Sequence, residues 1–133
     1  MTDDQFMSAF EDATLDPNLF DHEAHIRMGW LYVTRYPLTE AIDRFASSLK
    51  RLTKALGAEA KYHETITWFY MLLIADRQAL CTAKSFDGFL AANTDLVGKP
   101  SVLTRYYHPK TLASVRARTH YVLPDMVAGK EAA

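Results

Sequence analysis

The run Thr65-Ile66-Thr67-Trp68-Phe69-Tyr70-Met71-Leu72-Leu73-Ile74-Ala75 is the strongest indication of the fold, because it carries no charged side chain. It is about half as long as the roughly 20 apolar residues that span a bilayer. A helix that is apolar nearly all round is typically buried in a protein core. Gly57 is a natural helix terminator, so we predict a central helix from about Ala60 to Leu80.

Two amphipathic segments precede this run. Asp21 can cap a helix from His22 to about Tyr36, which Pro37 closes because the residue before a proline avoids helical geometry. Thr39 is the predicted cap of the next helix, in which apolar residues recur at alternating spacings of four and three. These apolar residues are Leu38, Ile42, Phe45, Leu49, Leu52 and Leu56. The pattern predicts a half-buried surface helix.

The remaining segments have shorter signals. Thr2 and Gln5 form a predicted capping box for a first helix that ends near Ala13. The other predicted elements are short helices at 85–92, 102–107 and 109–118 and a lone extended segment at 119–122. We therefore predict an all-α fold, a single-domain irregular helical bundle of about five to seven helices over residues 1–127, with a flexible tail at 128–133.

The composition is that of an ordinary globular protein, with 133 residues of which 49% are hydrophobic and 23% charged. The net charge of −1 gives no general attraction for nucleic acid or anionic lipid, so neither a nucleic-acid nor a membrane partner is predicted. The single cysteine, Cys81, excludes an internal disulfide and a thiolate-only metal site. Because the start Met-Thr-Asp-Asp-Gln lacks the features of a secretory signal, we predict a cytoplasmic protein. The oligomeric state stays open, a homodimer included.

Three histidines stand near the starts of the two most apolar helices. His22 and His25 share one uncharged helix side with Gly29, and residues three apart have Cβ atoms about 5–6 Å apart. Two imidazoles at that spacing can bind one metal ion at about 2.0–2.1 Å from each nitrogen. His63 lies on an apolar stripe of the predicted central helix. It joins the other two only if the two helices run parallel or cross steeply.

Three neutral imidazoles suit zinc, iron or copper and leave coordination positions for water, dioxygen or substrate. We therefore predict a small metalloenzyme in which His22, His25 and His63 hold one divalent transition metal beside an aromatic-lined pocket. It would act on a small molecule, with Glu64 or Tyr70 assisting proton transfer. The identity of the metal and the reaction stay open.

Two other interpretations of the same residues stay open. A metal-free enzyme that uses one histidine as a general base is a variant of this site. The alternative from another class is a non-catalytic binding or regulatory helical module with structural histidines. His108 and His120 lie in less regular sequence, and each is a candidate for a fourth ligand.

Two motifs carry a resemblance to known sequences. Phe20-Asp21-His22-Glu23-Ala24-His25-Ile26-Arg27 and Lys61-Tyr62-His63-Glu64-Thr65-Ile66-Thr67 resemble an uncharacterised family of small bacterial all-helical proteins. The motifs of that family are F-x-H-x-x-H-(I/L/V)-R and K-Y-H-x-T-(I/L)-T. The similarity extends through 89–93 and 122–125, so that it covers about residues 19 to 127. The resemblance implies no activity, but it points to the same three histidines, whereas the positions of Glu64, His108 and His120 are more variable.

Overall fold

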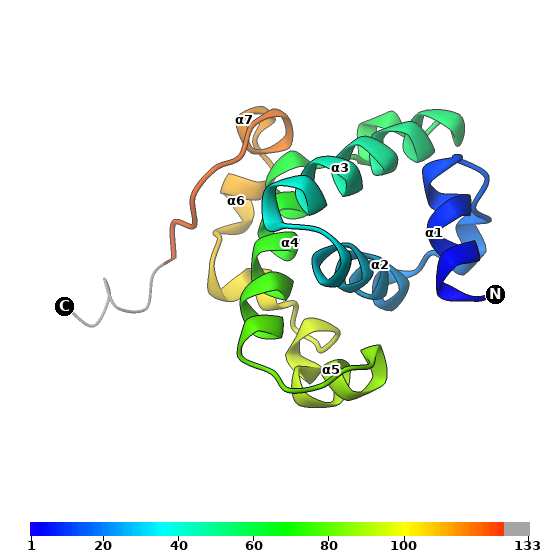
Figure 1. Cartoon of the computed structure of the whole chain (residues 1–133). Helices are drawn as coiled ribbons and strands as arrows, with labels where there is room; N and C mark the ends of the chain where they lie inside the picture. Colours follow the sequence, from blue (N-terminus) through cyan, green and yellow to red (C-terminus); the bar gives the residue numbers. More distant parts are fainter. Residues whose placement is uncertain (127–133) are drawn as a thin grey trace.

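A computed structural model describes residues 1–126, and this part of the chain is built from seven α-helices (Figure 1). They are α1 (Asp3–Glu11), α2 (His22–Arg35), α3 (Leu38–Ala55), α4 (Glu64–Ala79), α5 (Phe86–Ala92), α6 (Pro109–Leu112) and α7 (Val115–Thr119). Four 3-10 turns connect them, at Pro17–Leu19, Glu59–Lys61, Thr94–Leu96 and Val102–Arg105. The predicted all-α bundle of five to seven helices is confirmed. The tail predicted at 128–133 lies outside the described residues.

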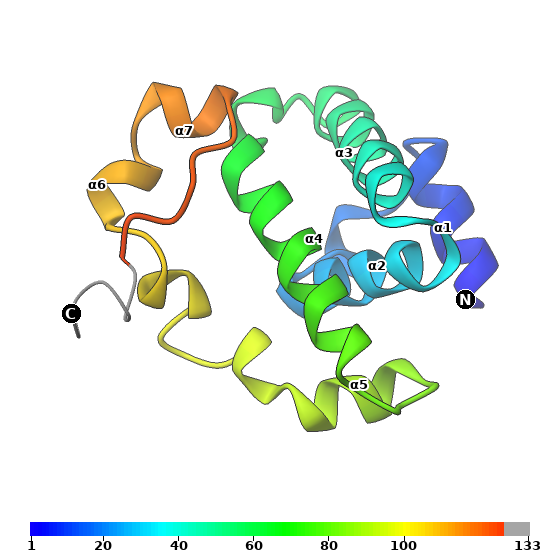
Figure 2. The ribbon, with the colours of Figure 1, turned by 60° about the vertical axis from the view of Figure 1, so that its left-hand side comes forward.

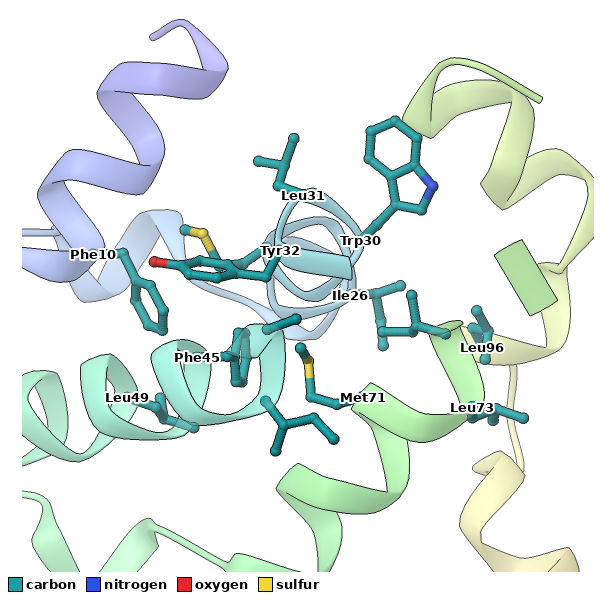
Figure 3. Close-up of a cluster of buried hydrophobic side chains, with 14 of the residues drawn as sticks. Phe10, Ile26, Trp30, Leu31, Tyr32, Phe45, Leu49, Met71, Leu73 and Leu96 are labelled. Carbon is teal, nitrogen blue, oxygen red and sulfur yellow. The ribbon is translucent and has the colours of Figure 1, made fainter. Parts of the chain in front are cut away.

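The apolar run forms the central helix α4, which packs against α2, α3 and α7 (Figure 2). The core surrounds α2, where side chains from α1, α3 and α4 meet (Figure 3). Phe10, Tyr32 and Phe45 form its aromatic centre, with ring centroids 5.3–6.0 Å apart. Such edge-on and tilted contacts between aromatic rings add stability beyond the apolar area that they bury. Among the described residues, no helix is both long enough and apolar enough to cross a membrane.

Helices α2 and α4 pack against each other with a glycine of α2 at the contact. A Cβ atom on Gly29 would lie 2.9 Å from Ile74 Cδ1 and 3.2 Å from Met71 Sδ. On one side of this contact the His22 ring lies 5.4 Å from the Tyr70 ring, and on the other Trp30 donates to Gln78 at 2.8 Å. The two helices therefore run in the same direction through the crossing.

The helix starts follow side-chain capping at most predicted places. Thr2 and Gln5 form the predicted capping box, and the Asp21 carboxylate accepts a hydrogen bond from the Ala24 amide at 2.9 Å. The predicted Thr39 cap is wrong. The backbone of Pro37 already sets the entry into α3, and the helix begins at Leu38 with no side-chain cap.

The start of α4 and the C-terminal helices also differ from prediction. The segment Glu59–Lys61 forms a 3-10 turn, so α4 begins at Glu64 rather than near Ala60, with His63 as its cap. The predicted helix at 109–118 is divided in two because Ser114 caps a new helix. The extended segment predicted at 119–122 forms no strand in the described chain, because α7 runs through Thr119 and residues 121–122 have no regular secondary structure.

A buried threonine of α4, Thr65, bonds to the C-terminal segment (residues 112–122). The Thr65 hydroxyl lies 2.6 Å from the Ala117 carbonyl and 2.7 Å from the His120 carbonyl, and it accepts from the Val122 amide at 3.1 Å. The Tyr107 hydroxyl donates to the Val122 carbonyl at 2.6 Å. Buried polar groups need such partners, so Thr65 fixes where this segment lies on α4.

Candidate functional site

A pocket of about 330 Å³ lies between α2, α3 and α4, beside the Gly29 crossing. We call it the histidine pocket. Its lining residues are His22, His25, Ile26, Gly29, Phe45, Leu49, Ile66, Thr67, Tyr70, Met71 and Ile74. Of the described residues, those that line it include no Lys, Arg, Asp or Glu. A largely apolar pocket with a few convergent polar groups is typical of a small-molecule site.

His25 is held in one orientation and one tautomer. Its Nδ1 lies 2.9 Å from the Asp21 carbonyl oxygen, which can only accept, so Nδ1 carries the proton. The Phe20 ring stacks on the imidazole with centroids 3.8 Å apart. No group within residues 1–126 bonds to Nε2, and no buried side-chain nitrogen or oxygen there lacks a partner. The Nε2 lone pair is therefore accessible.

The surroundings of His25 favour its neutral form. Burial of the half-buried ring is the main cause that lowers its pKa below 6.5, and the nearby His22 lowers it further. The Asp21 carbonyl and carboxylate act in the opposite direction, but they do not outweigh burial. At neutral pH His25 is consequently an uncharged imidazole with a free lone pair, the form that accepts a proton or binds a metal.

His22 stands at the exposed edge of the same pocket. Its Nε2 lies 2.8 Å from the Leu96 carbonyl oxygen, so Nε2 carries the proton and Nδ1 keeps its lone pair. The ring meets Tyr70 edge-on. The two histidines of α2 thus expose opposite ring nitrogens, Nδ1 on His22 and Nε2 on His25.

Two polar side chains of α4 complete the pocket. The Thr67 hydroxyl donates to the His63 carbonyl at 2.8 Å, which leaves its lone pairs available. The Tyr70 hydroxyl lies 3.3 Å from Ser101 Oγ, and burial raises the pKa of Tyr70. Tyr70 is therefore a neutral hydroxyl at physiological pH. The structure places this predicted catalytic residue in the pocket with His22 and His25.

His63 lies elsewhere and has a different role. Its Nδ1 accepts from the Ile66 amide at 3.1 Å, and its Nε2 donates to the Leu112 carbonyl at 2.8 Å. Both ring nitrogens are thus bonded to backbone. His63 precedes Tyr70 by seven residues, about 10 Å along a helix axis, and does not line the pocket. His63 caps α4 and joins it to the C-terminal segment.

The other predicted side chains are also outside the pocket. Glu64 accepts a hydrogen bond from the Tyr62 hydroxyl at 2.6 Å and borders a separate surface hollow beside Lys50. His108 and His120 are exposed, and the His120 ring bonds to the neighbouring Thr119 hydroxyl. Within residues 1–126 no group of three or more His, Cys, Asp or Glu side chains is arranged to hold a metal ion. The three-histidine site stays a prediction, and it requires His63 to release a backbone bond.

The groups that orient the two pocket histidines are not predicted from the sequence. The Leu96 carbonyl lies 74 residues from His22 in the chain, so no local pattern indicates it. Phe45 and Leu49, which form the α3 wall, belong to the predicted apolar face of that helix but were not assigned to a pocket. The stacking of Phe20 on His25 has a local signal, since Phe20 directly precedes the Asp21 cap.

Comparisons with known proteins give no further information on the function of the chain. No protein family matches it, and neither the curated proteins nor the solved structures give a match. Function must therefore be inferred from the chemistry of the histidine pocket.

Proposed function

We propose that this chain is a small enzyme that acts on a small, mainly apolar molecule in the histidine pocket, with His25 as its general base. The observation that carries the proposal is the accessible Nε2 lone pair of an imidazole whose other nitrogen is bonded to the Asp21 carbonyl. A general base needs this combination of a defined tautomer, a neutral state and access to the substrate.

The groups around His25 support a catalytic role because they fix the base before substrate binds. The bond to Asp21 and the stack on Phe20 restrict the ring in position and in plane. A base that is already oriented needs little rearrangement when the reaction occurs. Such orientation is not required of a histidine that only fills space.

Tyr70 is the proposed hydrogen-bond donor to charge that develops on the substrate. Its hydroxyl stays protonated at neutral pH because burial raises its pKa, so it can donate to an oxygen that becomes negative. His22 is the second acceptor at the pocket edge, through its free Nδ1. General acid–base catalysis of this kind contributes about 10²–10⁴-fold in rate.

Hydrolysis of 4-nitrophenyl acetate tests His25 as an accessible base or nucleophile. All proteins in the assay carry Cys81→Ser, because a free thiol also reacts with such esters. We expect the rate to rise with pH around a midpoint below 6.5, and His25→Phe to lower it about 100-fold. The control is His108→Phe, which changes an exposed histidine outside the pocket. A rate no higher than that of free imidazole would contradict catalysis and favour the non-catalytic binding module.

A mononuclear metal site is the second candidate function for the same pocket. The specific observation is that His22 and His25, three residues apart on α2, each keep one ring nitrogen without a partner in the described chain. Neutral imidazoles are ligands for zinc, iron and copper, and a carbonyl bonded to the second nitrogen orients such a ligand. Substrate or water would supply the remaining coordination positions.

Elemental analysis of protein purified without an affinity tag tests the metal site. We expect about one equivalent of a transition metal, lost in His22→Ala and in His25→Ala and retained in the control His120→Ala. His63→Ala separates the two versions of the site, because only the three-histidine site loses metal with it. Less than about a tenth of an equivalent, with no uptake on titration, would contradict both versions.

A further inference from the structure

We infer that the histidine pocket selects uncharged molecules that carry an O–H or N–H group on an apolar ring, the chemistry of phenols and indoles, and rejects carboxylates of the same shape. The inference rests on the proposed function for its site, and it adds the class of substrate. It follows from the charge, the hydrogen-bonding character and the size of the pocket.

Within residues 1–126, the pocket offers no positive side chain to an anion. The pocket walls supply six apolar side chains, and the lining includes no cation among the described residues. An anion that enters loses its hydration and gains no counter-charge, which is strongly unfavourable in an apolar site. A neutral ligand does not lose hydration of a full charge on entry. The walls are formed by Ile26, Phe45, Leu49, Ile66, Met71 and Ile74.

Helix N-termini could provide positive charge in place of a side chain, but both nearby ones are already capped. At the start of α2 the Asp21 carboxylate accepts from the Ala24 amide at 2.9 Å. At the start of α4, His63 Nδ1 accepts from the Ile66 amide at 3.1 Å. Glu23 and Glu64 add negative charge to the two first turns. At each helix start one amide is therefore already bonded to a cap, and an acidic side chain in the first turn disfavours an anion.

Most polar side chains of the pocket offer hydrogen-bond acceptors. Three of the four polar side chains in the lining donate their proton to a backbone carbonyl: His25 to Asp21, His22 to Leu96 and Thr67 to His63. What each of them has left is a lone pair. A ligand that donates can bond to any of these three side chains, whereas a carboxylate would face their lone pairs with its own and could accept only from Tyr70. The donated proton is also the one that His25 would remove.

The volume of the pocket limits the size of its ligand. A volume of about 330 Å³ is at the lower end of the range for small-molecule sites. Gly29 bounds the pocket at the crossing of α2 and α4, since it lines the pocket and a Cβ atom there would meet the ends of the Ile74 and Met71 side chains. One- or two-ring compounds fit this volume better than larger ones.

Three naphthalene derivatives of equal ring size test the inference by isothermal titration calorimetry at about pH 7.5, where His25 is neutral. We expect 2-naphthol to bind about tenfold more tightly than 2-methoxynaphthalene, which lacks a donor. We expect 2-naphthoate to bind more weakly than both. Binding of 2-naphthoate as tight as that of 2-naphthol would overturn the inference.

Two pairs of variants assign the selectivity to its causes, with thermal unfolding as a check of folding. His25→Phe keeps a ring against Phe20 but removes the lone pair, so the preference for 2-naphthol over 2-methoxynaphthalene falls to about twofold. Exposed His120→Phe leaves the preference unchanged. Half-buried Ile66→Lys adds a cation at the lining and raises 2-naphthoate affinity about tenfold, whereas Ile66→Met does not. Unchanged selectivity in both His25→Phe and Ile66→Lys would overturn the inference.

The outcomes separate this inference from the proposed function. Tight 2-naphthoate binding together with histidine-dependent ester hydrolysis contradicts the substrate class alone. Selective 2-naphthol binding without ester hydrolysis contradicts the general-base function alone, because recognition needs the lone pair of His25 but no turnover.

Discussion

The histidine pocket and the start of α4 use the same residue types in opposite ways. In the pocket, His22 and His25 each bond one ring nitrogen to a carbonyl and leave the other free. At the start of α4, His63 bonds both nitrogens to backbone, and the Thr65 hydroxyl is surrounded by three backbone groups. The number of backbone groups bonded to a side chain therefore distinguishes residues that keep a polar atom for a ligand from residues that only hold the structure together.

This difference predicts where substitutions affect stability and where they affect function. Changes at the α4 start should lower the free energy of unfolding and spare the pocket, because its polar atoms hold the C-terminal segment in place. Changes at the pocket histidines should affect ligand binding and ester hydrolysis more than folding.

The largest effect is expected for Thr65→Val. The substitution keeps the volume but leaves the buried Val122 amide without an acceptor and removes the one hydroxyl proton that the carbonyls of Ala117 and His120 share. We expect the free energy of unfolding, measured in urea, to fall by about 3 kcal/mol. Exposed Thr119→Val is the control, with a loss below about 0.5 kcal/mol. Similar losses in both variants would show that Thr65 does not hold the C-terminal segment on α4.

The second prediction concerns the helix crossing that bounds the pocket. In Gly29→Val the new side chain meets the ends of the Ile74 and Met71 side chains and overpacks the crossing, which should cost about 2 kcal/mol of unfolding free energy. It should also abolish binding of 2-naphthol. Gly98→Val is the matched control, because a Cβ atom there would be 3.5 Å from its nearest neighbour. Unaltered 2-naphthol binding in Gly29→Val would place the ligand outside this pocket.

The third prediction separates His63 from the pocket histidines. His63→Ala removes the cap of α4 and the bond to Leu112 and should lower the free energy of unfolding by about 1.5 kcal/mol. His63→Asn restores a capping acceptor, so it should recover about half of that loss. Both variants should keep the ester hydrolysis rate of the parent. Loss of that rate in His63→Asn would join His63 to the functional site.

The smallest effect is a pH dependence of stability. Because burial lowers the pKa of His25 below 6.5, the folded protein binds fewer protons there than the unfolded chain. The free energy of unfolding is therefore unaffected by His25 above about pH 6.5, and it falls as the pH decreases from there toward the lower pKa of the folded state. Urea unfolding should therefore show a steeper loss on acidification for the parent than for His25→Phe. Equal pH dependence in the two proteins would contradict a lowered pKa at His25.

Local signals predicted a large part of this fold. The apolar run gave the central helix, and the Thr2–Gln5 box and the Asp21 cap gave the starts of α1 and α2. The errors lie where backbone geometry competes with side-chain signals. Pro37 starts α3 before Thr39 can act as a cap, and a 3-10 turn delays α4 until Glu64.

The all-helical fold and the shared helix face of His22 and His25 follow from the sequence alone, because both depend on spacing along a single segment. Which ring nitrogens are bonded at His22 and His63 depends instead on tertiary packing. The carbonyls of Leu96 and Leu112 reach His22 and His63 across 74 and 49 residues of chain. Such bonds depend on how distant segments pack, and no local pattern encodes them.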